Sequence, residues 1–446
     1  MKYPGTNEFK QLCDLVLSEH LVIMTGSGIS LDALREFDSN NVPSWPGLIS
    51  DMNRDLPSPV PFPQDFLNTE PIKAATILKN LFNFSGLDFF STLRKYVKPK
   101  EDYYSPTHRH IARLYPKGII TLNFDDLHEK AHKELKEDIE SGYTKIIPFS
   151  KPGRQQMKEY LLKENSQPFI LKAHGCVNDS NELIIEEEGF ERILKDEPEY
   201  REFIQNLLVN NNFLFLGFGF ADKDFNDFLE NILNRFGGPL QNHLRIQKVN
   251  SEDENYKDEL LTKFGIHTID INEWSELPEV IEKASSTPGP RLQRILEDAI
   301  NDVNTIRSKA HSELRDLSHN GKRIAYEILK IKIEENQKED FNHSEYVYSL
   351  GCLEPKSAHL RDKIKEDIFS ILDKEIRAET IAHCLATFDF YLDFKDLKRL
   401  ELIQTKISEK SLKNDQEFPD NDQRIENYFN FLKTRLRATE HRKGQK

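Results

Sequence analysis

The 446-residue sequence contains few cysteines: Cys13, Cys176, Cys352 and Cys384, none of them close to another in the sequence. A structural zinc ribbon needs four closely grouped ligands, and small extracellular domains need a denser set of cysteines for disulfides. The spacing therefore excludes a cysteine-based zinc ribbon. We expect no bound zinc and a location in the reducing cytoplasm.

The sequence also lacks long apolar runs and an excess of positive charge. Its mean hydropathy is −0.63, and no stretch approaches the roughly 18 apolar residues of a membrane-spanning helix. The N-terminus does not have the basic and then apolar pattern of a signal peptide. The 75 acidic and 61 basic residues give a net charge of −14, which disfavours nonspecific nucleic-acid binding. We expect a soluble globular protein without a membrane or nucleic-acid partner.

Glycine is scarce in the last third of the chain, with three glycines after residue 290. Apolar residues recur there at helical spacing, beginning with Leu292, Ile295 and Leu296, which predicts an all-α domain. Pro288-Gly289-Pro290 precedes this change. We therefore predict two domains, a catalytic one over 1–285 and a helical one over 286–446, the latter for assembly or partner docking.

Glycine is concentrated instead near the N-terminus, where the apolar run 21–24 leads into Thr25-Gly26-Ser27-Gly28-Ile29-Ser30. Glycine lets backbone N–H groups approach an anion closely, and the N-terminal end of the following helix attracts phosphate. The fingerprint of dinucleotide-dependent dehydrogenases needs a third glycine where this chain has Leu31. The spacing thus indicates a phosphate-binding turn outside that class. A plain strand-to-helix turn is the structural alternative.

Apolar strands alternate with helical segments over residues 10–275, which predicts a Rossmann-like parallel sheet with helices on both faces. We expect strands at 21–25, 118–122, 168–173, 212–217, 243–249 and 266–271. Ligands of such sheets bind outside the carboxyl ends of the strands. The proline-rich segment 43–63 predicts an irregular loop, either a cover over the ligand or a surface excursion.

Three further motifs follow predicted strands: Thr121-Leu122-Asn123-Phe124-Asp125-Asp126, then His174-Gly175, then Gly217-Phe218-Gly219. With Gly26-Ser27-Gly28-Ile29-Ser30, they resemble in order and spacing the sirtuin family. The sequence is most similar to the sirtuin-like NAD-consuming effectors of prokaryotic antiphage defence.

The resemblance implies a role for each matching residue. Asn123 and His174 would be catalytic, and the NAD-binding positions would be Gly26, Ser27, Gly28, Ile29, Ser30, Asp125, Gly217 and Gly219. Cleavage of the nicotinamide–ribose bond needs a fixed polar group and an acid–base group that titrates near neutrality, which an asparagine and a histidine can supply. The structural alternatives are an N-cap for Asn123, a satisfied strand-end position for His174 and a helix first turn for Asp125.

The sequence differs from that of protein-deacylating sirtuins at several positions, and these differences bear on the expected activity. The zinc ribbon is missing, Leu122 replaces a glutamine of the deacylase motif, and 42–46 reads Val-Pro-Ser-Trp-Pro. These differences favour an NAD glycohydrolase, a toxic defence effector that depletes NAD. The alternatives are an NAD-dependent deacylase or ADP-ribosyl transferase, and a catalytically silent NAD-binding scaffold. The expected partners are further copies of the chain, and an ATPase of the HerA type or an Argonaute-like protein encoded nearby.

Overall fold

A computed structural model of the chain describes residues 6–30, 45–97, 106–135, 143–148, 150–162, 167–178, 183–185, 187–189, 197–217, 229–230, 243–249, 254–301, 307–335, 343–355, 357–374, 378–388, 390–411 and 422–443. The chain divides into two compact units. The first comprises Met1–Val16, His20–Glu137 and Ser141–Ser285, and the second Leu17–Glu19, Asp138–Glu140 and Ser286–Lys446.

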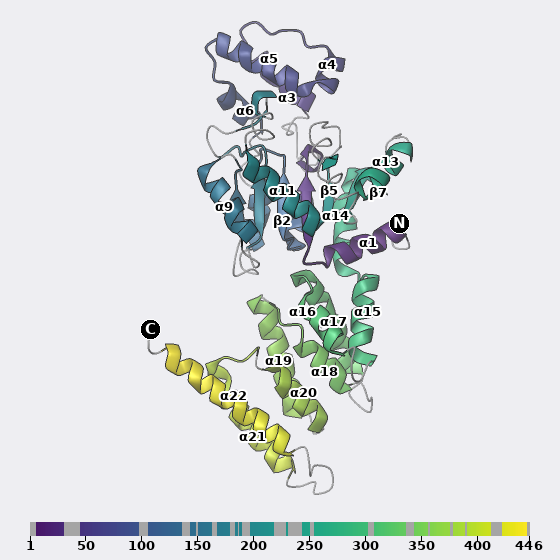
Figure 1. Cartoon of the computed structure of the whole chain (residues 1–446), viewed down its shortest axis with the longest axis vertical. Coiled ribbons are helices and arrows are strands. Elements are labelled where there is room, and N and C mark those ends of the chain that lie inside the picture. Colours follow the sequence, from purple (N-terminus) through teal and green to yellow (C-terminus); the bar gives the residue numbers. More distant parts are fainter. Residues whose placement is uncertain are drawn as a thin grey trace. The chain divides into compact units, whose positions relative to one another are not determined.

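A parallel sheet forms the centre of the first unit (Figure 1). Its described strands are β1 (Leu21–Thr25), β2 (Gly118–Thr121), β3 (Thr144–Ile146), β4 (Phe169–Lys172), β5 (Asn212–Leu216), β6 (His243–Lys248) and β7 (Ile266–Ile271). All neighbouring strands pair in parallel. The six predicted strands are confirmed, whereas the short edge strand β3 was not predicted.

The strand order is β3-β4-β2-β1-β5-β6-β7. Without the edge strand β3, this is the order of a dinucleotide-binding sheet, which runs outward from the first strand in one direction and then in the other. The direction reverses between β1 and β5, since β1 pairs with both β2 and β5. A ligand crevice is expected where the carboxyl ends of β1 and β5 meet.

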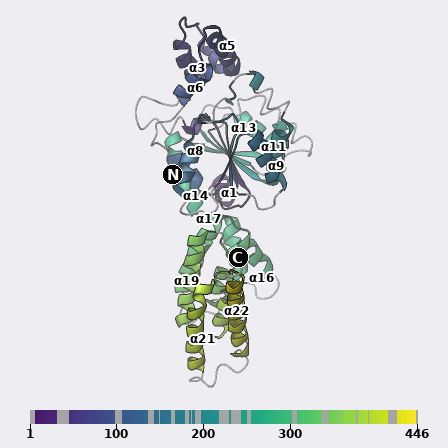
Figure 2. The same ribbon diagram turned by 90° about the vertical axis from the view of Figure 1, so that its left-hand side faces the viewer.

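Helices cover both faces of the sheet, as Figure 2 shows with α8 (Leu127–Glu134) and α14 (Leu277–Ser286) opposite α9 (Lys151–Leu162) and α11 (Pro198–Asn210). Further described helices around the sheet include α1 (Asn7–Val16), α7 (Pro106–Arg113) and α13 (Glu254–Phe264). On the α9 and α11 face, Val22, Met24, Phe169 and Leu171 belong to one buried apolar cluster. Because side chains alternate along a strand, Ile23 and Thr25 point to the face of α8.

Four helices form an insertion between β1 and β2: α3 (Trp45–Arg54), α4 (Gln64–Thr69), α5 (Pro71–Phe84) and α6 (Phe89–Val97). The prediction of an irregular loop over 43–63 is wrong for Trp45–Arg54, because proline is tolerated in a first helical turn and Pro46 is the second residue of α3. The apolar core of the insertion includes Phe124, Val177, Leu183 and Ile185. The insertion thus packs against the loops that follow β2 and β4.

Every regular element described beyond Ser286 is a helix, which confirms the predicted fold class of an α/β domain followed by a helical region. These elements are α15 (Pro290–Asn301), α16 (Arg307–Arg315), α17 (His319–Glu335), α18 (His343–Gly351), α19 (Ala358–Lys374), α20 (Ala378–Phe388), the 3-10 helix η3 (Phe394–Asp396), α21 (Leu397–Ser411) and α22 (Asp422–Lys443). Among the described residues, no helix is both long and apolar enough to cross a bilayer.

Candidate functional site

Two glycine turns meet where the strand order reverses. The Gly26 N–H donates to the Leu216 carbonyl over 3.1 Å, and the Gly28 N–H donates to the Gly217 carbonyl over 3.2 Å. A Cβ on Gly28 would lie 2.8 Å from the Gly217 Cα, closer than real Cβ atoms come to other atoms. Gly217 has a φ of +61°, which glycine adopts without strain. The two turns after β1 and β5 therefore pack directly against each other, with no room for a side chain at Gly28 or Gly217.

The β1 turn leads directly into helix, with residues 27–30 helical. Ile29 and Ser30 are buried, whereas Ser27 and Gly28 are partly exposed. A helix N-terminus at the carboxyl end of the first strand attracts phosphate through its N–H groups and dipole. This arrangement fits the diphosphate of a dinucleotide.

The Asn123 side chain lies just beyond β2 and is held in one orientation. Its Nδ2 donates to the Gly26 carbonyl over 3.0 Å and to Ser30 Oγ over 2.9 Å. Ser30 in turn donates to Asp125 Oδ2 over 2.7 Å, so the serine oxygen must accept from Asn123. Both amide hydrogens are thereby used within the protein, and Oδ1, which has no hydrogen-bond donor among the described residues, can accept from a ligand.

Asp125 supports this arrangement with both carboxylate oxygens. Oδ2 accepts from Ser30, and Oδ1 accepts from the Leu127 N–H over 3.2 Å. Helix α8 begins at Leu127, so Asn123 does not cap it and Asp125 precedes its first turn. Asp125 is buried; that it contacts the ribose remains a prediction.

His174 follows β4, the strand next to β2. Its imidazole hydrogen-bonds with the backbone of Leu122, the residue before Asn123. Desolvation lowers the pKa of His174 to about 4, with that hydrogen bond opposing the shift. The histidine is therefore neutral at physiological pH. The two predicted catalytic residues therefore lie on neighbouring loops, after β2 and after β4.

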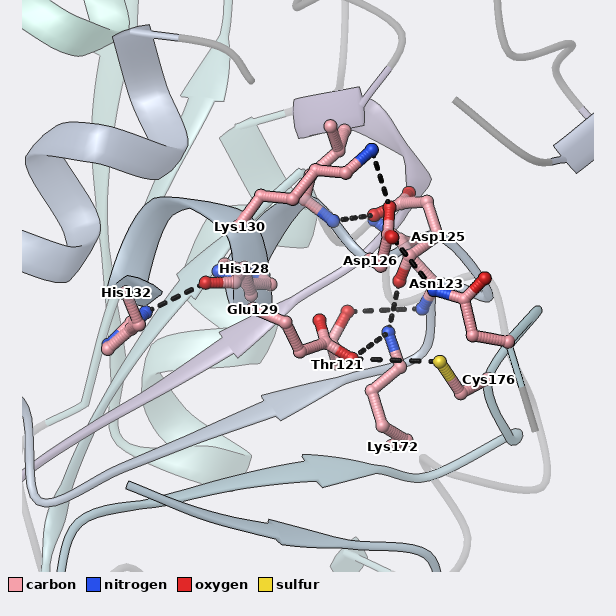
Figure 3. A network of polar contacts seen from close by, with 12 residues as sticks. Thr121, Asn123, Asp125, Asp126, His128, Glu129, Lys130, His132, Lys172 and Cys176 are labelled. Carbon is pink, nitrogen blue, oxygen red and sulfur yellow. Dashed lines mark hydrogen bonds and ion pairs between the residues drawn. The ribbon is translucent and has the colours of Figure 1, made fainter. Parts of the chain in front are cut away.

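Figure 3 shows a polar network next to the loop that follows β2, formed around Asn123, Asp125, Glu129 and Lys172. The buried Lys172 Nζ donates to the Asp125 carbonyl and lies 3.7 Å from Glu129 Oε1. Cys176 Sγ is 3.6 Å from the same carboxylate oxygen. Lys172 was not among the residues predicted from the sequence, although its charge at the end of the apolar run Phe169-Ile170-Leu171 is a signal that the sequence contains.

Two histidines are buried beside the network. The rings of His108, on α7, and His128, on α8, have centroids 4.5 Å apart, and His128 Nε2 lies 3.0 Å from Thr25 Oγ1. Burial lowers the pKa of His108 to about 4 and that of His128 well below its usual value. These neutral histidines pack α7 and α8 against the end of β1.

The structure therefore brings together Gly26, Gly28, Ser30, Asn123, Asp125, His174 and Gly217. Gly219 lies outside the described residues. Among the described residues, no group of three or more His, Cys, Asp or Glu side chains could hold a metal ion.

The parallel sheet, its strand order and the helices on both faces define a Rossmann-like α/β protein. Residues 117–269 match the family model described as a SIR2-like domain. This part of the chain is similar to the SIR2-like family, which confirms the resemblance drawn from the sequence motifs. The matched region contains Asn123, His174 and Gly217 but not the β1 turn.

The chain is also similar in sequence to three bacterial proteins that each carry the name NAD(+) hydrolase ThsA. The protein from Enterococcus faecium is 24% identical over 309 residues, which cover 61% of this chain and 56% of the relative. Those from Bacillus cereus and Acinetobacter baumannii are 25% and 27% identical over 194 residues, 40% of this chain and 38% of each relative. The chain thus spans about half, or less, of the length of these relatives.

Proposed function

We propose that this chain is an NAD glycohydrolase that converts NAD to ADP-ribose and nicotinamide. The observation that carries the proposal is the fixed amide of Asn123, whose Oδ1 is left for a ligand beside the glycine turns at the strand-order reversal. The SIR2-like domain and the name NAD(+) hydrolase borne by the relatives support the same activity.

The chemistry requires a positioned acceptor. Loss of nicotinamide gives the ribose oxocarbenium character, and a nucleophile must then approach its anomeric carbon. Asn123 Oδ1 can accept a hydrogen bond from a ribose hydroxyl or from the attacking water. Because Gly26 and Ser30 already hold the amide, little reorganisation is needed when the substrate binds.

His174 supplies the proton acceptor in this proposal. The imidazole is neutral at cellular pH and can therefore accept a hydrogen bond from water or from a ribose hydroxyl, but its pKa of about 4 makes it a weaker base than the near-neutral histidine expected from the sequence. The Leu122 contact orients the ring relative to the loop of Asn123.

The biological role in this proposal is that of a defence effector whose activity depletes cellular NAD. Constant hydrolysis would kill the host cell, so the activity must be held off until a trigger arrives. Assembly through residues 286–446, or a partner such as an ATPase of the HerA type or an Argonaute-like protein, would supply that control. In the cytoplasm the enzyme would have direct access to the NAD pool.

The test measures NAD, nicotinamide and ADP-ribose by chromatography for the full chain. Asn123→Ala and His174→Ala should each lower turnover by at least about 100-fold, because each removes a positioned group of the reaction. Asn178→Ala is the matched control, since Asn178 is an exposed asparagine that bonds Asp126 over 2.8 Å outside the glycine turns.

Wild-type turnover by both Asn123→Ala and His174→Ala would overturn the proposed site. Nicotinamide release that depends on an acylated lysine peptide would instead favour the deacylase alternative. Binding of NAD without turnover, in the presence of candidate partners, would favour the scaffold alternative.

A further inference from the structure

Three buried polar side chains end three neighbouring strands. Thr25 ends β1, Thr121 ends β2 and Lys172 ends β4, and the strand register places Thr25 opposite Thr121 and Thr121 opposite Lys172. All three are fully buried. They point to the α8 face, because Met24, Ile120 and Leu171 belong to the cluster on the other face. The row is thus a polar line at the ends of three strands whose other residues are apolar or glycine.

Each member of this row bonds a different part of the segment 123–128. Thr121 Oγ1 accepts from the Asn123 N–H over 3.1 Å, Lys172 Nζ donates to the Asp125 carbonyl, and Thr25 Oγ1 lies 3.0 Å from His128 Nε2. The row therefore holds the segment that carries Asn123 at its beginning, middle and end.

Lys172 is the member whose burial costs the most free energy. An ammonium loses its hydration when it is buried, and an apolar residue would be cheaper at the end of an apolar strand. Glu129 compensates part of this cost at 3.7 Å, and its other oxygen, Oε2, is buried with no hydrogen-bond partner among the described residues. Stability alone does not explain a lysine here.

The loop after β4 is tied to the segment 123–128 at a second point. The Val177 N–H donates to the Phe124 carbonyl over 2.8 Å. Lys172 and Val177 therefore hold the carbonyls of Asp125 and Phe124, and His174 lies between them in the sequence. The loop of His174 is thus fixed to the loop of Asn123 on both sides of the histidine.

We infer that Lys172 is a positioning residue, which sets the Asn123 loop against the His174 loop through its bond to the Asp125 carbonyl. Asp125 in turn holds Ser30, and Ser30 holds the Asn123 amide. The inference rests on the proposed function, since it assigns Lys172 a role in the turnover of NAD. Glu129 in this view stabilises the ammonium and does not act on the reaction.

The test separates positioning from stability with three variants of the full chain. Lys172→Met removes the donor and leaves the partly buried Glu129 carboxylate without its cation. Lys172→Met with Glu129→Gln removes both charges, and Glu129→Gln alone keeps the donor. Measurements are the melting temperature, kcat and KM for NAD, and hydrogen exchange of the amides in residues 122–128.

We expect the double variant to recover most of the melting temperature lost in Lys172→Met. Its kcat should still be about 10- to 100-fold lower than that of the wild type, with KM changed less than about threefold. Hydrogen exchange should quicken in residues 122–128 of both lysine variants. Glu129→Gln should keep kcat within about threefold.

Wild-type kcat and wild-type exchange in the double variant would overturn the positioning role. So would a loss of kcat in Glu129→Gln as large as that in Lys172→Met, because the charge pair would then matter and not the bond to Asp125. If the wild-type chain does not hydrolyse NAD, the proposed function fails, while hydrogen exchange still decides whether Lys172 holds the loop.

Discussion

Gly217 tolerates no side chain, for two independent reasons. Its φ of +61° disfavours any other residue, and a Cβ there would lie 2.5 Å from the Ile29 nitrogen. That nitrogen belongs to the turn that we assign to the NAD diphosphate. A side chain at Gly217 would therefore both strain its own backbone and displace the phosphate turn.

Gly217→Ala should lower the free energy of unfolding by more than the roughly 1–2 kcal/mol of a left-handed alanine, and it should weaken NAD binding at least tenfold. Chemical denaturation and calorimetric titration with NAD measure the two effects. The titration is best done in the His174→Ala background, so that NAD is not consumed.

Gly86→Ala is the matched control for this prediction. Gly86 has a similar φ of +67°, but nothing lies within 4 Å of its Cβ position. Gly86→Ala should lower the free energy of unfolding only by the cost of a left-handed alanine, and it should bind NAD as the wild type does. Equal effects of the two substitutions on NAD binding would contradict the contact argument.

Buried histidines on β6, α7 and α8 make the stability of the first unit depend on pH. His243 on β6 accepts a hydrogen bond from the Phe213 N–H on β5 over 3.1 Å. Burial lowers the pKa of both His243 and His108 to about 4. The unfolded chain, in which histidine titrates near 6.5, therefore binds protons at a higher pH than the folded chain does.

The free energy of unfolding should fall as the pH drops from about 6.5 towards 4. Each such histidine contributes about 1.4 kcal/mol per pH unit within this window and nothing further below it. His243→Asn keeps an acceptor for Phe213 but cannot be protonated. It should reduce the loss between pH 6.5 and 4.5 by up to about 2 kcal/mol, as measured by urea denaturation at a series of pH values.

His20→Asn is the comparison for this experiment, because His20 is exposed. Its pH dependence should match that of the wild type. A His243→Asn variant with the full wild-type slope would mean that His243 is not held neutral in the folded protein.

The helical unit presents apolar side chains to solvent, among them Leu402 on α21 and Phe431 on α22, which are 57% and 58% exposed. Isolated exposed apolar residues are common, but apolar positions on packed helices also serve as interfaces between copies. We expect residues 286–446 to mediate assembly of the chain into a homo-oligomer.

Light scattering should report a homo-oligomer for the full chain, and Phe431→Glu should shift it towards the monomer because a charge would be buried at the interface. Phe84→Glu is the control, since Phe84 is 93% exposed on α5 in the first unit. A monomeric wild-type chain, or an equal effect of both substitutions, would remove the assembly role from the helical unit.

Local sequence determined much of this protein. Apolar runs bounded by glycine or polar residues predicted six of the described strands, because a strand buried on both faces needs such a run. The strand β3 (Thr144–Ile146) was not predicted, since it is short, lies at the sheet edge and has only one buried residue. The proline content of 43–63 predicted a loop where helix α3 lies, because composition does not show that Pro46 falls in the first helical turn, where proline is tolerated.

The glycine turn, Asn123 and His174 were predicted from motifs, because backbone freedom and side-chain chemistry are local properties. Tertiary structure alone decided how these groups are held. Gly28 touches Gly217 across about 190 residues of sequence, and Lys172 reaches the carbonyl of Asp125 from a neighbouring strand. Such contacts depend on strand order and register, which no local pattern specifies. The motif predicts that Asn123 is important, but only these contacts determine how its side chain is oriented.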